Sequence, residues 1–186
     1  MNSHPSVVAQ AAALGPHAVL PLLAPAVITP LRPAPAGRVL VAGGGRDLLW
    51  SADQIAAALV ARTGGQLVHE LLHGGARGAD RAIGRAARQL GWPVEVLPAN
   101  WRRHGRAAGP IRNRELLQQA IAKAVAHTSP GSLASVLVVA FPGGPGTASL
   151  VREARRMASH SPVPISVAEV SPSAGLWAVP ACVGRS

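Results

Sequence analysis

The chain has 186 residues, 48% of them hydrophobic, which is ample core for one domain of about 150 residues. Its formal net charge of +10 favours anionic partners, either nucleic acid or a phosphorylated small molecule. A coding bias toward arginine would explain the charge equally well. The single cysteine, Cys182, excludes a disulfide framework and a cysteine-based metal site.

The two ends of the chain differ in composition from its middle. Residues 1–37 hold seven prolines and no acidic residue, and the apolar stretch from Val7 to Ile28 is interrupted by prolines. The start of the chain also lacks the Lys or Arg of a signal peptide. We expect a disordered extension, or one that covers a neighbouring subunit, in a cytoplasmic protein with no membrane role. Residues 171–186 are expected to form a tail, which leaves one domain over 38–170.

Apolar runs alternate with helical patterns through the middle of the chain. Strands are predicted over 38–42, 67–72, 93–97, 135–141 and 163–168. Helices are predicted over 52–62, 78–90 and 111–127. A fourth helix is predicted from the glycine-rich segment at 142–147 through Ala158, with Ala158 facing inward. The segment between 97 and 111 is expected to be a long polar loop. Such alternation predicts an α/β fold, a Rossmann-like three-layer sandwich with a mostly parallel sheet of about five strands.

Four glycine-containing loops stand at the predicted ends of strands, where an open sheet of this kind binds its ligand. They are VAGGGRD (41–47), HGGARGAD (73–80), AAGPIRN (107–113) and FPGGPGT (141–147). Glycine lets another group approach the main chain, and a helix N-terminus offers unpaired N–H groups to an anion. The loops therefore predict a ligand that carries phosphate.

The candidate ligand-binding residues come from all four loops. They are Gly43, Gly44, Gly45, Arg46, Asp47, Gly74, Gly75, Arg77, Gly78, Asp80, Arg81, Asn100, Trp101, Arg106, Gly109, Arg112, Asn113, Pro142, Gly143, Gly144, Gly146 and Thr147. The last loop is expected to hold the phosphate, with Arg77 and Arg112 as charge partners. The carboxylate and amide groups of Asp80, Asn100 and Asn113 are expected to contact ribose or base.

Two of these residues have an equally good structural explanation. Asp80 lies in the first turn of a predicted helix, where a carboxylate is favoured by the helix dipole without any ligand. Trp101 could stack on a base or could close the hydrophobic core. Both alternatives stay open at the level of the sequence.

Several familiar sites are absent from the pattern. Three adjacent glycines without an acidic residue about twenty positions later do not make a dinucleotide fingerprint, and the last loop lacks the Lys-Ser/Thr pair of a Walker A loop. His69 and His73 are expected on one face of a strand, too far apart for a metal and without a carboxylate. Ser149 and Ser159 lack the setting of a nucleophile elbow. We therefore expect neither a cofactor nor a metal.

The four segments together resemble the YspA-like, YpsA-related branch of the SLOG superfamily, a Rossmann-like group. The likeness lies in Val41–Asp47, Gly74–Arg81, Pro98–Asn113 and Phe141–Ala148, in that order and spacing, and spans roughly residues 38–168. LOG phosphoribohydrolases and the DNA-binding DprA proteins are more distant members. The resemblance implies binding of a nucleotide or a nucleotide-derived ligand, as a sensor or a nucleotide-processing domain, and homo-oligomers are common among such folds.

The resemblance leaves catalysis undecided. LOG-type enzymes follow a similar glycine loop with a glutamate for N-glycosidic cleavage, whereas this chain continues Ala148-Ser149-Leu150 and reaches an acid only at Glu153. If the protein is an enzyme, a nucleotide N-glycosidic hydrolase using Asp80 or Asp47 is expected. A third alternative is a DprA-like binder of single-stranded nucleic acid, with Arg102, Arg103 and Arg106 beside Trp101.

Overall fold

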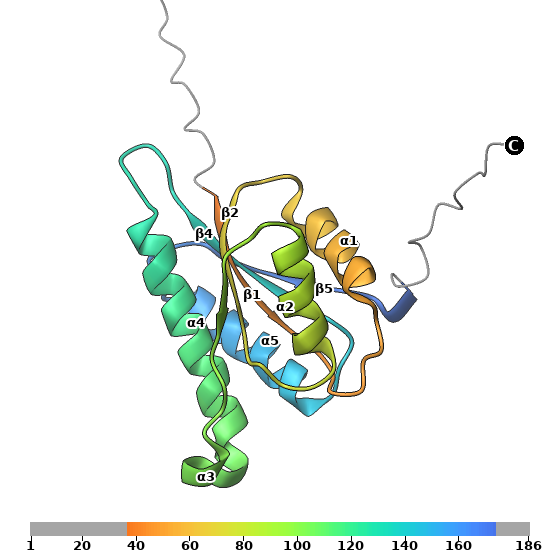
Figure 1. The fold of residues 1–186 in the computed structure, drawn as a ribbon. Helices are drawn as coiled ribbons and strands as arrows, with labels where there is room; N and C mark the ends of the chain where they lie inside the picture. Colours follow the sequence, from red (N-terminus) through yellow and green to blue (C-terminus); the bar gives the residue numbers. More distant parts are fainter. Residues whose placement is uncertain (1–36, 174–186) are drawn as a thin grey trace, which may run out of the picture. The chain divides into compact units, whose positions relative to one another are not determined.

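The computed structural model describes residues 37–173, and the predicted extension and tail lie almost entirely outside this range. Five strands form one parallel sheet in the order β3-β2-β1-β4-β5 (Figure 1). Their bounds are Arg38–Gly43 (β1), Val68–His73 (β2), Val94–Val96 (β3), Ser135–Ala140 (β4) and Ile165–Glu169 (β5). The predicted α/β fold with a five-stranded parallel sheet is confirmed.

Helices cover both faces of this sheet. Their bounds are Ala52–Thr63 (α1), Ala79–Gln89 (α2), Trp101–His104 (α3), Ala108–Ala126 (α4) and Pro145–Ala158 (α5), with a 3₁₀ turn, η1, over Gly105–Ala107. The helices α1 and α2 pack on one face of the sheet, against Leu40 and Leu71. On the other face, α4 and α5 pack against Val39 and Val41. The result is the Rossmann-like three-layer arrangement.

The sequence explains why β1 lies at the centre of the sheet. Successive side chains of a strand point to opposite faces, and Val39, Leu40 and Val41 are all apolar and fully buried. The start of α1 follows equally directly from the sequence. The Ser51 hydroxyl accepts from the Gln54 amide, and the Gln54 side chain accepts from the Ser51 amide, which completes a capping box.

The segment between β3 and α4 differs from its prediction as a polar loop. Asn100 caps a short helix, α3, by accepting a hydrogen bond from the Arg103 amide, and η1 then leads directly into α4. Helix α4 therefore begins at Ala108 rather than near residue 111. Pro110 is tolerated within its first turn because the amide it lacks would have no partner there.

Two further predictions about individual side chains are wrong. Ala158 is exposed at the last residue of α5, whereas Ala154 and the partly buried Met157 pack against the core. His69 and His73 contact helices on opposite sides of the sheet, because the register of β2 against β1 shifts near the start of the strands. His69 stacks on His127 after α4, whereas His73 lies against Gly84 of α2.

The strand order determines where a ligand can bind. Chain connections run outward in both directions from the β1–β4 pair, and the carboxyl ends of these two strands lie level, with Gly43 opposite Ala140. In open α/β sheets this switch in strand order creates a crevice above the strand ends. Within residues 37–173, no helix is long and apolar enough to cross a membrane.

Candidate functional site

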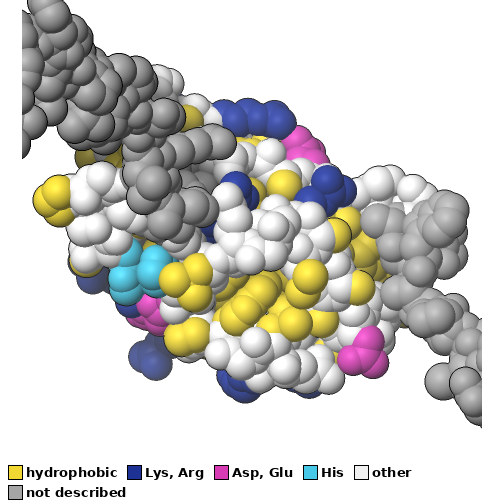
Figure 2. All heavy atoms as spheres, turned by 90° about the horizontal axis from the view of Figure 1, so that it is seen from above, with side chains coloured by type: hydrophobic (Ala, Val, Ile, Leu, Met, Phe, Trp, Pro, Cys, Tyr) yellow, Lys and Arg dark blue, Asp and Glu magenta, His cyan; other side chains and the backbone are white. Residues whose placement is uncertain are grey.

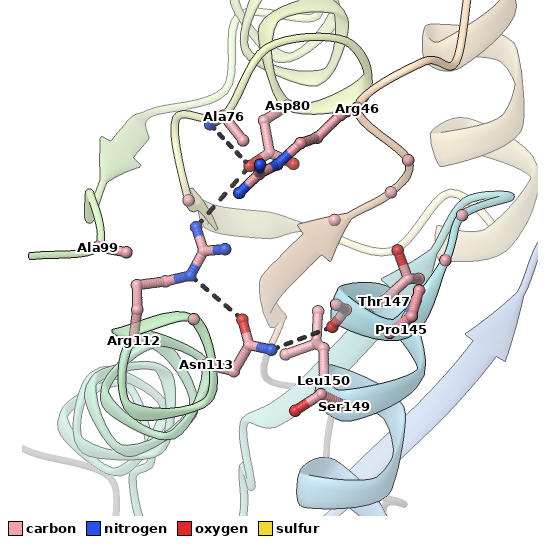
Figure 3. A pocket seen from close by; sticks show the side chains of 18 of the residues that line it. Arg46, Ala76, Asp80, Ala99, Arg112, Asn113, Pro145, Thr147, Ser149 and Leu150 are labelled. Carbon is pink, nitrogen blue, oxygen red and sulfur yellow. Dashed lines mark hydrogen bonds and ion pairs between the residues drawn. The ribbon is translucent and has the colours of Figure 1, made fainter. Parts of the chain in front are cut away.

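A cavity of about 980 Å³ opens above the carboxyl ends of the strands. All four glycine-containing loops contribute to its wall. The predicted residues that line it are Gly43, Gly44, Gly45, Arg46, Asp47, Gly74, Gly75, Asp80, Trp101, Arg106, Gly109, Arg112, Asn113, Pro142, Gly143, Gly144, Gly146 and Thr147. Residues from distant parts of the sequence therefore converge on one site, as Figure 3 shows for a subset of them.

The backbone of Gly45 joins three of the loops. Its N–H donates to the Pro142 carbonyl at 2.9 Å, and its carbonyl accepts from the Ala79 amide at 3.0 Å. The neighbouring Gly44 has no room for a side chain, because a Cβ there would lie 2.7 Å from the Cβ of Ala79 and 2.8 Å from that of Phe141. These glycines serve close packing of the loops, so the floor of the cavity is built in advance of any ligand.

Asp80, at the start of α2, is 4% exposed and binds the loop that precedes it. Its Oδ2 atom accepts from the Ala76 amide at 3.0 Å and lies 3.8 Å from Nη1 of Arg112. Burial raises the pKa of this carboxyl, while the Ala76 amide, the Arg112 guanidinium and the amides of Gly44 and Gly74 favour its charged form. The carboxylate thus organises the loops around it.

Arg112 and Asn113 extend this network across the cavity (Figure 3). Nε of Arg112 donates to Oδ1 of Asn113 at 3.2 Å, and Nδ2 of Asn113 donates to the Gly146 carbonyl at 3.1 Å. The network therefore runs from α2 through α4 to the first turn of α5. Gly74 is required beneath it, since a Cβ at that position would coincide with the Arg112 guanidinium.

His73 supports the second loop from below. The ring is 4% exposed, and its Nδ1 atom accepts from the Gly75 amide at 3.1 Å. The bond requires a neutral ring that is protonated on Nε2, an atom that is buried without a hydrogen-bond partner in the described part of the chain. Burial, together with the charges of Arg88 and Arg112, lowers the pKa of His73 to about 4.

The N-terminus of α5 faces the cavity without a cap. Gly144 is the N-cap residue and supplies no side-chain hydrogen bond, and Pro145 follows it. A Cβ placed on Gly144 or on Gly146 would meet no atom within 4 Å, so the packing of the protein does not require glycine there. Gly143 differs, because a Cβ there would lie 2.6 Å from the Gly45 amide nitrogen. Open space therefore adjoins first-turn amides that can bind an anion.

Arginine and tryptophan side chains form one side of the rim. The Arg46 guanidinium lies over the Trp101 ring, 5.3 Å from its centroid, and Trp101 is 50% exposed. Arg106 of η1 also lines the cavity, and Arg152 approaches from α5. Asp47 is paired at 4.0 Å with Arg77, and both side chains are largely exposed.

Four predicted site residues do not line the cavity. Arg77 and Arg81 are exposed outside it, and the Asn100 side chain caps α3. Gly78 is the N-cap of α2, with a positive φ of 75°, and a Cβ there would collide with the Arg46 carbonyl. Its glycine therefore has a structural explanation.

Sequence reasoning missed a row of residues on α5. Pro145, Ser149 and Arg152 all line the cavity, and they are spaced i, i+4, i+7 along the helix. Once the last loop is placed at a helix start, this spacing is enough to find Arg152. The other lining residues that were not predicted are Ala42, Leu48, Ala76, Pro98, Ala99, Pro110, Leu116 and Leu150.

Neither a metal site nor the glutamate of LOG-type enzymes is present among the described residues. No group of three His, Cys, Asp or Glu side chains could hold a metal ion in that range. Glu153, the first acid after the last loop, does not line the cavity and is bound by Arg156 and Arg114. Hydrogen bonds from these two arginines lower its pKa to about 2, which leaves it no capacity for acid–base chemistry near neutral pH.

The fold and the site define a Rossmann-like domain whose glycine-containing loops enclose a preformed crevice. The model of the YspA, cpYpsA-related SLOG family matches residues 37–104, so this segment of the chain is similar to the family that the sequence motifs resemble. The match runs from β1 to α3 and includes the first two loops and Trp101, whereas α4 and the last loop lie beyond it. No curated protein and no solved structure matches the chain.

Proposed function

We propose that the cavity binds a nucleotide or a nucleotide-derived phosphorylated ligand, with its phosphate at the N-terminus of α5. The observation that carries this proposal is the pair Gly144 and Gly146, which line the cavity beside open space. A side chain at either position would fill the space that an anion needs to reach the first-turn amides. The similarity of residues 37–104 to the SLOG family independently supports a nucleotide-related function.

The charges around the cavity support an anionic ligand. Four arginines and two aspartates line it, an excess of two positive charges. Asp80 is already paired with Arg112, and Asp47 with Arg77, so neither carboxylate neutralises Arg46, Arg106 or Arg152 on the cavity wall. Guanidinium groups bind phosphate oxygens in pairs of parallel hydrogen bonds, so Arg106 and Arg152 suit a phosphorylated molecule, whereas Arg46 lies over the Trp101 ring.

A role in binding is favoured over hydrolysis of an N-glycosidic bond. Asp80 is the buried carboxylate of the cavity, but its acceptor capacity is used by backbone amides and Arg112. Asp47 is exposed at the rim. A general base must be free to take a proton and must be held against the substrate. Asp80 is not free, and the only ion pair of Asp47 among the described residues is the exposed contact with Arg77 at 4.0 Å. We therefore propose a sensor or nucleotide-handling domain in which Asp80 maintains the shape of the site.

The test is a thermal-shift screen of the full chain against nucleoside mono-, di- and triphosphates and ribose 5-phosphate, with chromatography of every mixture. A ligand at a hundred times its Kd stabilises the folded protein by about 2.7 kcal/mol, which is readily seen. Arg152→Ala should abolish the shift, and Arg85→Ala, an exposed arginine of α2 outside the cavity, should not. Release of free base would establish the hydrolase instead, and no shift with any ligand would refute the proposal.

A further inference from the structure

The rim of the cavity contains an aromatic surface that the fold does not bury. Of the three tryptophans in residues 37–173, Trp50 and Trp92 pack against the core, whereas Trp101 is 50% exposed. A half-exposed indole at a cavity rim is costly, because burying an aromatic ring of this size is a large source of stability. Trp101 is therefore available to a ligand.

The indole has neighbours from two other segments of the chain. Trp101 is the first residue of α3, whose N-terminus is capped by Asn100. Gly109 of α4 lies beside the edge of the indole: a Cβ added to this glycine would lie 3.5 Å from Cη2 of Trp101. Arg46 comes from the opposite side, on the loop after β1, and lies over the ring face at 5.3 Å. Both Arg46 and Trp101 line the cavity, so this face of the indole is turned toward it.

We propose that the base of the ligand inserts between the Arg46 guanidinium and the Trp101 indole, and that this slot makes the cavity selective for ligands with a flat aromatic ring. The inference rests on the proposed function, because the slot acts on a ligand whose phosphate is held at α5. Insertion requires the two planes to separate to about 7 Å, twice the contact distance of about 3.5 Å. Arg46 is exposed on the loop after β1, so its side chain can move to admit the base.

The guanidinium and the indole suit a base for different reasons. A tryptophan face stacks on any nucleobase, and a guanidinium plane stacks on the opposite face with an added cation–π contribution. The slot is therefore expected to recognise the presence of a base without distinguishing strongly among bases. The slot and the start of α5 line the same cavity, which matches a ligand with one charged end and one aromatic end.

A stretch of single-stranded nucleic acid running over α3 is a competing occupant. Arg102 and Arg103 are exposed beside Trp101, but neither lines the cavity. Figure 2 shows the opposite end of the domain, away from α3, and the Lys and Arg side chains visible there outside the grey atoms are scattered. Trp101 and Arg106, unlike Arg102 and Arg103, line the cavity, where a small ligand would bind. The observations therefore favour a small nucleotide, and the nucleic acid becomes an outcome of the test.

The test compares adenosine 5′-monophosphate with ribose 5-phosphate, which lacks the base, by titration calorimetry on the full chain. Trp101→Leu keeps apolar volume and removes the stacking surface, while Trp101→Phe keeps an aromatic face. We expect the leucine variant to bind the nucleotide about 5- to 150-fold more weakly, the range for one base stacked on an aromatic ring, with ribose 5-phosphate unchanged. Phenylalanine should restore most of the loss.

Three results would overturn the inference. An equal loss of both ligands in Trp101→Leu would make the indole a structural residue, and no loss of either would place the base elsewhere. Loss of binding to a single-stranded oligonucleotide, with nucleotide binding intact, would assign the surface to nucleic acid; Arg103→Ala should then weaken binding as well. Failure of the proposed function looks different, since the unaltered protein would then bind neither small ligand.

Discussion

Gly146→Ala is the substitution that separates the ligand-binding role of the last loop from its structural role. Gly146 is the second residue of α5 and has a backbone conformation that alanine also adopts in helices. A methyl group there meets no heavy atom within 4 Å, and the carbonyl that accepts from Asn113 is unchanged. Alanine restricts the unfolded chain more than glycine does, so the substitution should stabilise the free protein by about 0.4–1 kcal/mol.

The same methyl group should weaken ligand binding. The Cα–Cβ bond of a helical residue tilts toward the helix N-terminus, which here is the direction from which an anion approaches the first-turn amides. Losing one charge-assisted hydrogen bond costs about 1.5–3 kcal/mol, which corresponds to roughly a 10- to 100-fold higher Kd. We therefore expect a variant that melts about 1–4 °C higher than the unaltered protein but binds its nucleotide more weakly.

The assay pairs differential scanning calorimetry of the free protein with titration of the same preparation. Ala148→Gly provides the matched control, because it makes the opposite exchange on the same helix at an exposed residue that does not line the cavity. The control should melt lower and bind normally. Unchanged affinity in Gly146→Ala, or affinity that simply follows melting temperature in both variants, would refute the argument that these glycines make room for an anion.

Three further predictions test other parts of the site. Arg106→Ala, on the cavity wall, should raise the Kd for a nucleotide about 10-fold or more, whereas Arg103→Ala, outside the wall, should change it less than 2-fold in the same titration at fixed salt. The neutral form of His73 is the one favoured by folding, so its contribution to the free energy of unfolding is fully present above pH 6.5 and is lost as the pH falls toward about 4. That contribution is at most about 3 kcal/mol. In His73→Asn the side-chain amide oxygen can still accept from the Gly75 amide, but the group no longer titrates, so the free energy of unfolding measured in urea should depend less on pH between 6.5 and 4. An unchanged slope would assign the pH dependence to other groups. Gly74→Ala drives the buried guanidinium above it out of place, which should cost about 1–3 kcal/mol and lower the melting temperature by about 3–12 °C. Near-normal melting would show that this packing is not needed.

Much of the fold follows from local sequence signals. Strand β1 contains three successive buried aliphatic residues, Val39 to Val41, a pattern typical of a parallel strand covered on both faces. The capping box of Ser51 and Gln54 marks the start of α1. The convergence of the four loops follows from the topology, because parallel strands place all their carboxyl ends at one edge of the sheet. The sequence was therefore sufficient to predict that the four loops meet around one cavity.

The roles of the individual residues depend on neighbours that the sequence does not reveal. Gly44 and Gly146 are both glycines of predicted phosphate loops, but a Cβ at the first would strike Ala79 and Phe141, whereas at the second it would meet nothing. The guanidinium of Arg77 lies outside the cavity, although its position at a helix start suggested an anion. Which glycine is structural and which arginine faces the ligand are decided by contacts between elements far apart in the chain.

Helix α3 shows a different limit. Its four residues are too few to form a helix alone, since the first turn is unfavourable without further stabilisation. The Asn100 cap and the continuation through η1 into α4 supply that stabilisation. A run of arginines and glycines gives no periodic signal for such a turn, so the polar-loop prediction was wrong in conformation even though it placed Trp101 and Arg106 at the site.

The most direct measurement is a ¹H–¹⁵N NMR titration of the labelled full chain with adenosine 5′-monophosphate, following the backbone amides of Gly144, Gly146 and Thr147. Binding of the phosphate at the start of α5 should move these resonances more than those of the exposed face of α2, with one saturating Kd. Saturable binding that leaves all three amides unmoved would place the phosphate elsewhere and contradict the proposed site.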